Sequence, residues 1–171
     1  AVPGTPGADD NASGVAALLQ AARALAEERP PGPVLFAATT LEEYGFVGAR
    51  HLVDRLRREG RTLRGVLDLE MVGYTARRQV APPGLDAPSI GDFIAVIADT
   101  RSQAVADAFV AAVRGAVPAL PVEGIVVRNG GRRLPVVRLS DHVPFWDAGL
   151  PAVMITDTAF LRNPNYHQPS D

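Results

Sequence analysis

Cysteine is absent from this sequence of 171 residues. Without thiols the chain can form no disulfide bond, and it can offer no thiolate as a nucleophile or a metal ligand. The lack of cysteine fits oxidising and reducing compartments alike, so the redox environment stays open. Any metal or catalytic site must therefore be built from oxygen and nitrogen groups.

Long apolar runs and an excess of positive charge are also missing. No stretch approaches the ~20 apolar residues that a membrane-spanning helix requires, and no signal-peptide pattern is present. Lysine and arginine number 17 against 19 acidic residues, which gives a formal net charge of −2. We therefore expect no membrane-spanning segment and no nucleic-acid binding.

The chain also has no initiator methionine. It opens on Ala1-Val2-Pro3-Gly4 and closes in the turn-rich Gln168-Pro169-Ser170-Asp171. We expect a fragment that lacks both termini of a longer protein and forms a single catalytic domain over residues 1–171. A domain of this size can bury roughly 70% of its unfolded surface, and 47% hydrophobic residues supply its core.

Apolar periodicity and turn residues predict helices that alternate with strands. We expect helices over 12–28, 46–59 and 102–113, and a short one ending at Gly149. We expect strands over 34–38, 65–72, 93–98, 122–127, 134–139 and 152–155, and a long loop over 74–91. This alternation predicts an α/β fold, with a central sheet covered by helices on both faces.

Acids and histidines follow the strands or precede a helix at five places along the chain. In α/β sheets the ligand site gathers at the carboxyl ends of the strands, where these residues are expected. Each place alone has an ordinary explanation, as a helix cap or a solvated turn. Five together indicate a bound cation. The residues are Asp9 and Asp10, Glu42 and Glu43, Asp68 and Glu70, Asp141 and His142, and His167.

Oxygen and imidazole ligands without sulfur favour zinc, with manganese or cobalt as substitutes. Several carboxylates with few histidines favour two metal ions that share a bridging carboxylate, as in hydrolytic centres. Of the adjacent Glu42 and Glu43, one can serve as a ligand and the other as a base that takes a proton from water.

Five segments resemble, in order, the motifs of the M28 family of two-zinc aminopeptidases. They are residues 7–14 (Gly-Ala-Asp-Asp-Asn-Ala-Ser-Gly), 42–45 (Glu-Glu-Tyr-Gly), 70–73 (Glu-Met-Val-Gly), 140–145 (Ser-Asp-His-Val-Pro-Phe) and 165–171 (Asn-Tyr-His-Gln-Pro-Ser-Asp). The resemblance spans the chain. It implies the zinc exopeptidase fold, in which the central sheet is mixed and mostly parallel.

The resemblance also implies metal ligands. Asp10 would bridge both zinc ions, beside a cis peptide bond to the next residue, and Asp9 would not be a ligand. Glu43 and His167 would bind one zinc, and Glu70 the other. Strand alternation alone allows Asp68 in place of Glu70, and the Met-Val-Gly that follows selects Glu70.

Further roles follow from the same resemblance. Glu42 would be the general base, with Asp141 as an acid beside it. Met71 and Tyr166, which flank two ligands, would line the pocket for the substrate's first side chain. Ordinary packing explains these two residues equally well.

One family ligand has no counterpart in the sequence. The second zinc of the family also takes a histidine from an upstream His-x-Asp motif, which neither His51 nor His142 matches. We therefore expect the second zinc to be held weakly by this chain.

The function expected from the resemblance is removal of the N-terminal residue from peptide substrates by a zinc-dependent exopeptidase. A glutaminyl cyclase of the same fold, which is a zinc transferase, and a non-catalytic binding domain are the alternatives. Dipeptidase and carboxypeptidase variants, the preferred side chain and the oligomeric state stay open. Because bacterial members are often exported, we expect a periplasmic or secreted protein.

Overall fold

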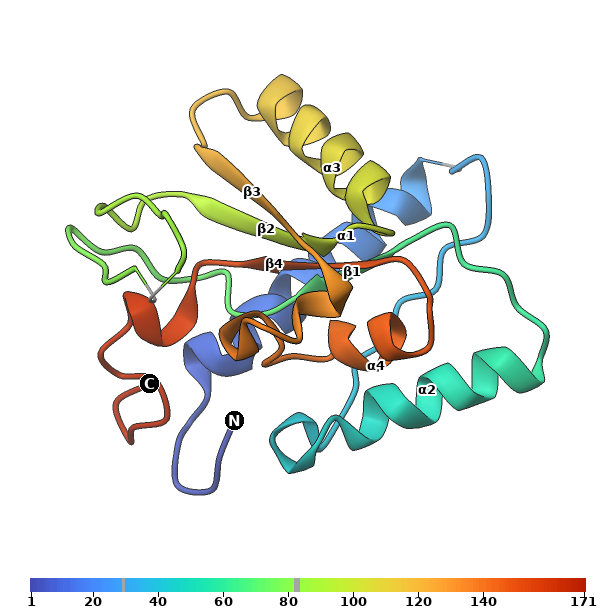
Figure 1. The fold of residues 1–171 in the computed structure, drawn as a ribbon, viewed down its shortest axis with the longest axis horizontal. Coiled ribbons are helices and arrows are strands. Elements are labelled where there is room, and N and C mark those ends of the chain that lie inside the picture. Colours follow the sequence, from blue (N-terminus) through green and yellow to red (C-terminus); the bar gives the residue numbers. More distant parts are fainter. Residues whose placement is uncertain (29, 82–83) are drawn as a thin grey trace.

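A four-stranded sheet runs through the centre of the computed structural model, which describes residues 1–28, 30–81 and 84–171 (Figure 1). The strands lie in the order β1 (Val66–Leu69), β4 (Ala152–Thr156), β2 (Ile94–Asp99) and β3 (Val122–Val127). β1 pairs with β4 in parallel and β2 pairs with β3 in parallel, whereas β2 and β4 are antiparallel. The prediction of a mixed, mostly parallel sheet is therefore confirmed.

Side chains alternate between the two faces of the sheet, and helices cover both faces. Val96, Ala98, Val153 and Ile155 belong to the core on the side of α3 (Gln103–Ala116). Ala95, Ile97 and Met154 belong to the core that includes residues of α2 (Val47–Arg58) and α4 (His142–Asp147). Figure 1 shows α3 on one side of the sheet and α2 and α4 on the other.

The predicted helices are confirmed to within a few residues. A short irregular turn, Ala8–Ser13, leads into α1 (Gly14–Glu27), which contacts β1. Four 3-10 turns complete the regular structure of the described residues. They are η2 (Glu42–Tyr44), η3 (Asn129–Gly131), η4 (Pro135–Val137) and η5 (Ala159–Leu161).

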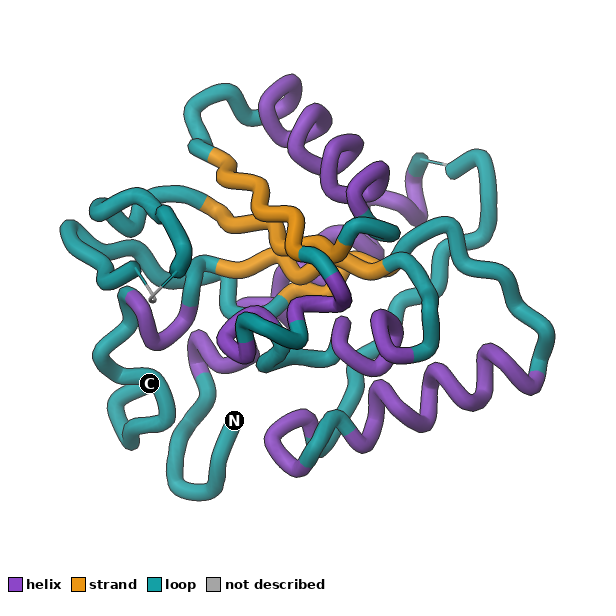
Figure 2. The backbone as a smooth tube through the Cα atoms, in the orientation of Figure 1, coloured by secondary structure: helices purple, strands orange, loops and turns teal. Residues whose placement is uncertain are grey.

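The predicted buried strand over 34–38 is wrong. The segment is extended but exposed, with Leu35 63% accessible, and it lies in the loop between α1 and α2 (Figure 2). Within the described part of the chain, no backbone hydrogen bond holds it. Apolar composition alone does not make a strand, because a strand also needs a neighbour to complete its ladder.

The strand predicted over 134–139 is also wrong. The middle of this segment forms η4, which begins at Pro135, and the residues on either side of η4 are irregular. Proline has no N–H to donate to a ladder, and its fixed φ suits a helical turn. The strand predicted over 65–72 is shorter than expected, because β1 ends at Leu69 and leaves Glu70 just beyond it.

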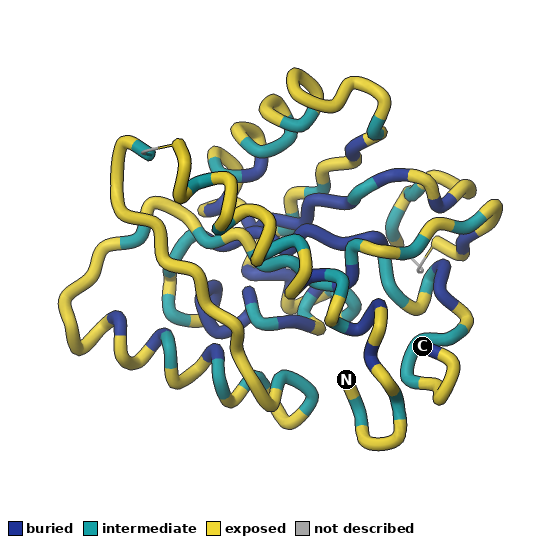
Figure 3. The backbone as a smooth tube through the Cα atoms, turned by 180° about the vertical axis from the view of Figure 1, so that it is seen from behind, coloured by how far each residue is buried: buried dark blue, intermediate teal, exposed yellow. Residues whose placement is uncertain are grey.

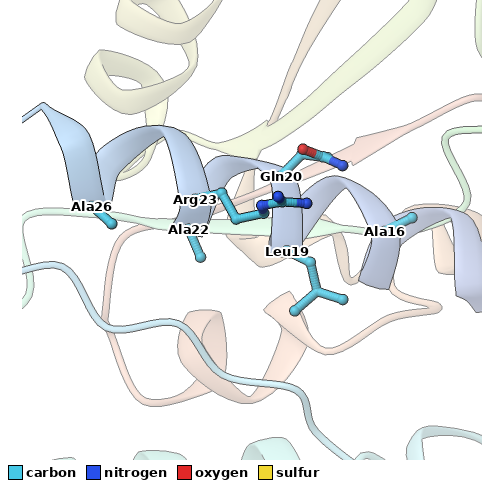
Figure 4. Close-up of a pocket in the computed structure, with 6 residues that line it drawn as sticks. All are labelled: Ala16, Leu19, Gln20, Ala22, Arg23 and Ala26. Atoms are coloured by element: carbon cyan, nitrogen blue, oxygen red, sulfur yellow. The ribbon is translucent and has the colours of Figure 1, made fainter.

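The outer side of α1 is less buried than its periodicity predicts. Val15 and Leu19 are 43% and 58% exposed, and Figure 3 shows exposed backbone along this helix and along α2. One side of α1 borders a hollow of about 540 Å³, drawn in Figure 4. No carboxylate or imidazole is among its lining residues, which are Ala16, Leu19, Gln20, Ala22, Arg23 and Ala26. Among the described residues, no helix combines the length and the apolar character needed to cross a membrane.

Trp146 provides a test of the core. Its side chain is 1% exposed, and its Nε1 donates to the Ala152 carbonyl at 2.7 Å. Trp146→Phe should lower the free energy of unfolding by about 1–3 kcal/mol, because a buried acceptor loses its donor and the smaller ring leaves a void. Urea unfolding followed by circular dichroism measures this. Leu19→Ala, at an exposed position, should change stability by less than about 0.5 kcal/mol; equal effects of the two variants would contradict this account of the core.

Candidate metal centre

Asp10, Glu43 and His167 are far apart in the sequence, and the fold brings their side chains together. Each offers a ligand atom, and these atoms all lie within 4.8 Å of one another. His167 Nε2 lies 2.8 Å from Glu43 Oε1 and 3.1 Å from Asp10 Oδ2. Two carboxylates and one imidazole converging on one point are a donor set that suits a divalent transition metal.

Asp10 has a buried carboxylate oxygen whose surroundings fit a cation. It is buried, and in the described part of the chain its Oδ2 accepts no hydrogen bond of acceptable geometry, despite the short distance to His167. Burial raises the pKa of this carboxyl above its ordinary value, and the charge of Glu43 raises it further. A cation between these groups would satisfy the free oxygen and stabilise both charges.

Asn11 joins this cluster to the end of β1. Its Nδ2 donates to the Leu69 carbonyl at 2.8 Å and to Glu70 Oε2 at 3.2 Å, and its Oδ1 accepts from the Met71 N–H at 3.0 Å. The peptide bond between Asp10 and Asn11 is cis, as the family resemblance implied. The close approach of the start of α1 to β1 also requires a glycine at Gly14, because a Cβ there would lie 2.3 Å from the Leu69 carbonyl oxygen.

Glu70 lies beside the three-residue cluster and is held by hydroxyl and amide donors. Its Oε2 accepts from Ser140 Oγ at 2.9 Å and from the Asn11 side chain. Burial raises the pKa of Glu70 to about 9, and the charges of Asp68, Glu42 and Asp10 raise it further. The electrostatic effect of Asp10 and the bond from Asn11 place this carboxyl near Asp10.

Glu42 lies in the same 3-10 turn as Glu43 and is half-buried. Burial, followed by the charges of Glu43 and Asp141, raises its pKa to about 8. Asp141 accepts a hydrogen bond from the Thr39 hydroxyl, and its other oxygen, Oδ1, is buried without a partner among the described residues. The structure therefore brings Asp141 into the neighbourhood of Glu42.

Asp9 has both carboxylate oxygens occupied by other donors. Oδ1 accepts from the Gly73 N–H at 3.1 Å, and Oδ2 accepts from Asn163 Nδ2 at 2.8 Å. Asp9 therefore anchors the loop that precedes α1 rather than facing the cluster.

Tyr166 and Glu70 border a cavity of about 130 Å³ that opens beside the cluster and extends along one face of the sheet. Its apolar lining includes Phe93, Ile97 and Met154. Tyr166 also stacks on the His167 ring, with 3.7 Å between centroids and 20° between planes. Met71, paired with Tyr166 in the sequence analysis, is fully buried and is not among the lining residues.

Several residues that support the site were not predicted from the sequence. Asn11 and Ser140 lie inside the recognised motifs, so their polar side chains were a usable signal. Thr39 and Asn163 lie outside any pattern, and their contacts with Asp141 and Asp9 depend on long-range folding.

Known proteins resemble this chain over nearly its whole length. The uncharacterized protein YfbL of Escherichia coli is 36% identical over 178 residues, which cover 98% of this chain and 53% of the relative. Aminopeptidase YwaD of Bacillus subtilis is 28% identical over 99% of this chain and 33% of its own length. The chain thus spans about half, or less, of these relatives.

Solved structures share the fold. BSAP, a zinc aminopeptidase from Bacillus subtilis, superposes with a TM-score of 0.66 at 26% identity, covering 100% of this chain and 38% of that protein. The LapA aminopeptidase of Legionella pneumophila gives a TM-score of 0.66 at 20% identity over 98% of this chain and 40% of its own, and at that identity shows the fold alone. The sequence model of Peptidase family M28 matches residues 1–171, and the chain therefore belongs to peptidase family M28.

Proposed function

We propose that this protein is a zinc-dependent exopeptidase that hydrolyses the N-terminal peptide bond of peptides. The observation that carries the proposal is the convergence of Asp10, Glu43 and His167, with one buried Asp10 oxygen unpartnered among the described residues. Membership of a peptidase family and likeness to proteins named as aminopeptidases support it. The cavity beside the cluster supplies room for a substrate side chain.

The donor set fits zinc, because it combines imidazole and carboxylate ligands without sulfur. Glu43 and His167 would hold one ion, Glu70 the other, and Asp10 would bridge the two. Bound zinc would polarise the scissile carbonyl and lower the pKa of a water molecule to about 7. Among the described residues, no histidine joins Glu70 as a possible ligand. We therefore expect the ion at Glu70 to be held more weakly than the ion at Glu43 and His167.

Glu42 would act as the general base. Its carboxylate would take a proton from the attacking water and deliver it to the leaving amine nitrogen. One C–O bond forms, the C–N bond breaks, and Glu42 returns to its starting state. Burial and the neighbouring carboxylates raise its pKa to about 8, and a nearby positive charge would lower that pKa towards the range suited to proton transfer near neutral pH.

The remaining groups would position the substrate. The site carboxylates would bind the free α-amine, and the cavity bordered by Tyr166 would receive the first side chain. Met71 is buried behind the surface of this site, so its contribution would be to packing around Glu70 rather than to direct contact.

Glu42→Gln tests the mechanism. The substitution keeps the size of the side chain but removes its ability to accept a proton, so kcat should fall by about 10²–10⁴-fold. Zinc content should stay near that of the unmodified protein, because Glu42 is not one of the proposed ligands. Hydrolysis of leucine p-nitroanilide and metal analysis of the same samples measure both quantities.

Glu59→Gln, on the exposed end of α2, is the matched control and should leave the rate unchanged. Retention of most activity by Glu42→Gln would rule out Glu42 as the base. Cyclisation of an N-terminal glutamine peptide without hydrolysis of the anilide would instead identify a cyclase.

The pH dependence of stability tests the charge crowding. The folded-state pKa values of Glu42 and Glu70, about 8 and 9, lie above the ordinary value of 4.5. In metal-free protein, the folded state therefore keeps protons that the unfolded state has lost between these values. The free energy of unfolding should fall as the pH rises from about 5 to about 9.

Urea midpoints measured across this range in EDTA should show the decline, and Glu70→Gln should reduce it. Saturating zinc should flatten the profile, since a cation lowers the pKa of both carboxyls. A metal-free midpoint that is constant or rises over the range would show that these carboxyls are not destabilised by burial.

A further inference from the structure

Ser140, Asp141 and His142 are consecutive residues, and each forms a hydrogen bond with a different group at or near the site. Ser140 Oγ donates to Glu70 Oε2 at 2.9 Å, and Asp141 accepts from the Thr39 hydroxyl. The His142 backbone N–H donates to Asp68 Oδ2 at 2.9 Å. We call residues 140–142 the corner. It links the end of β1 to the segment that carries Glu42 and Glu43.

His142 holds the corner in place through the contacts of its buried side chain. Its side chain is fully buried, with Nε2 2.9 Å from the Val137 carbonyl oxygen and Nδ1 3.2 Å from Asp68 Oδ2. A carbonyl oxygen only accepts hydrogen bonds, so Nε2 donates to Val137, and Nδ1 lies against the carboxyl of Asp68. The ring edge also packs on Trp146, with 4.4 Å between centroids and 80° between planes. Contacts on both nitrogens and on the ring leave the imidazole one orientation.

The segment that carries Glu42 lies between the corner and α2. On the α2 side, the Gly48 N–H donates to the Thr40 carbonyl at 3.0 Å, and a Cβ on Gly48 would lie 2.6 Å from the Thr40 nitrogen. On the other side, the Thr39 hydroxyl reaches Asp141. Upstream, residues 34–38 form no backbone hydrogen bond within the described part of the chain. The tie to Asp141 is thus what connects this segment to the sheet ahead of Glu42.

We propose that Thr39 and His142 are positioning residues, which act through the corner to set the place of Glu42 relative to the metal ligand Glu70. His142 fixes the corner on β1, and Thr39 fixes the segment on the corner. The catalytic part of this inference rests on the proposed function. The mechanical part, that these two side chains hold residues 39–45 in place, does not depend on any activity.

Thr39→Val is the first variant, because it removes the hydroxyl at an exposed position with little change of shape. Misplacing a catalytic base by a fraction of an ångström is costly, so kcat for leucine p-nitroanilide should fall about tenfold in zinc-loaded protein. KM should change less than twofold, since neither the cavity nor the cluster is altered. Thr39→Ser keeps the hydroxyl and should restore the rate, and Thr62→Val, also exposed, should have no effect.

Hydrogen exchange measured by mass spectrometry tests the mechanical part directly. The amides of residues 44–48 all donate to carbonyls of residues 40–42, so their protection reports on the segment. Thr39→Val and His142→Gln should each accelerate exchange of these amides about tenfold, while amides of α3 stay unchanged. His51→Gln, at an exposed position on α2, is the matched control for the histidine substitution.

The outcomes separate the two claims. If the unmodified protein neither binds zinc nor hydrolyses the anilide, the proposed function fails, and hydrogen exchange still decides whether the corner holds the segment. Unchanged exchange in both Thr39→Val and His142→Gln would overturn the positioning role. A Thr39→Ser variant as slow as Thr39→Val would also overturn it, because the hydroxyl would then not be the group that matters.

Discussion

Crowding of negative charge at one end of the sheet is the constraint on which the rest of the site depends. Burial raises the pKa of Asp10, Glu42 and Glu70, and the charges of neighbouring carboxylates raise each of these pKa values further. Such a group is stable only if protons or a cation neutralise it. His167 Nε2 lies 3.1 Å from Asp10 Oδ2 and 2.8 Å from Glu43 Oε1, so it completes a donor set that suits a divalent metal ion. The geometry therefore calls for a metal.

Neutral donors hold the carboxyl of Glu70 and the loop that carries Asp10. Asn11 ties Asp10 to the end of β1 and also donates to Glu70. Asp9, which precedes Asp10, is held by Gly73 and Asn163. These bonds fix the backbone around Asp10 and leave its Oδ2 without a hydrogen bond among the described residues.

Much of the fold could be predicted from the sequence, because its helices are strongly periodic and its inner strands are continuous apolar runs. β2, β3 and β4 are rich in apolar residues and also have adjacent strands to pair with, and they form as expected. The segment 34–38 has the same composition but no ladder partner, and it is exposed. The segment 134–139 contains Pro135, whose missing N–H is a signal in the sequence against a strand.

The candidate site, like the fold, could be predicted from the sequence only in part. Acids and histidines at the ends of strands could be found by residue type, and the structure brings Asp10, Glu43 and His167 together. The separation of Tyr166, at the cavity, from Met71, in the core, could not be found, because both follow or precede a ligand by one position. Thr39 gave no signal at all, since its partner lies 102 residues further along the chain.

The position of zinc tests the central claim most directly. Crystals of the zinc-loaded protein, measured on both sides of the zinc absorption edge, would give an anomalous difference map that locates each ion. The account predicts a strong peak about 2.0–2.2 Å from ligand atoms of Asp10, Glu43 and His167, with a weaker peak between Asp10 and Glu70. Zinc bound elsewhere, or no zinc at this cluster at saturating concentration, would contradict it.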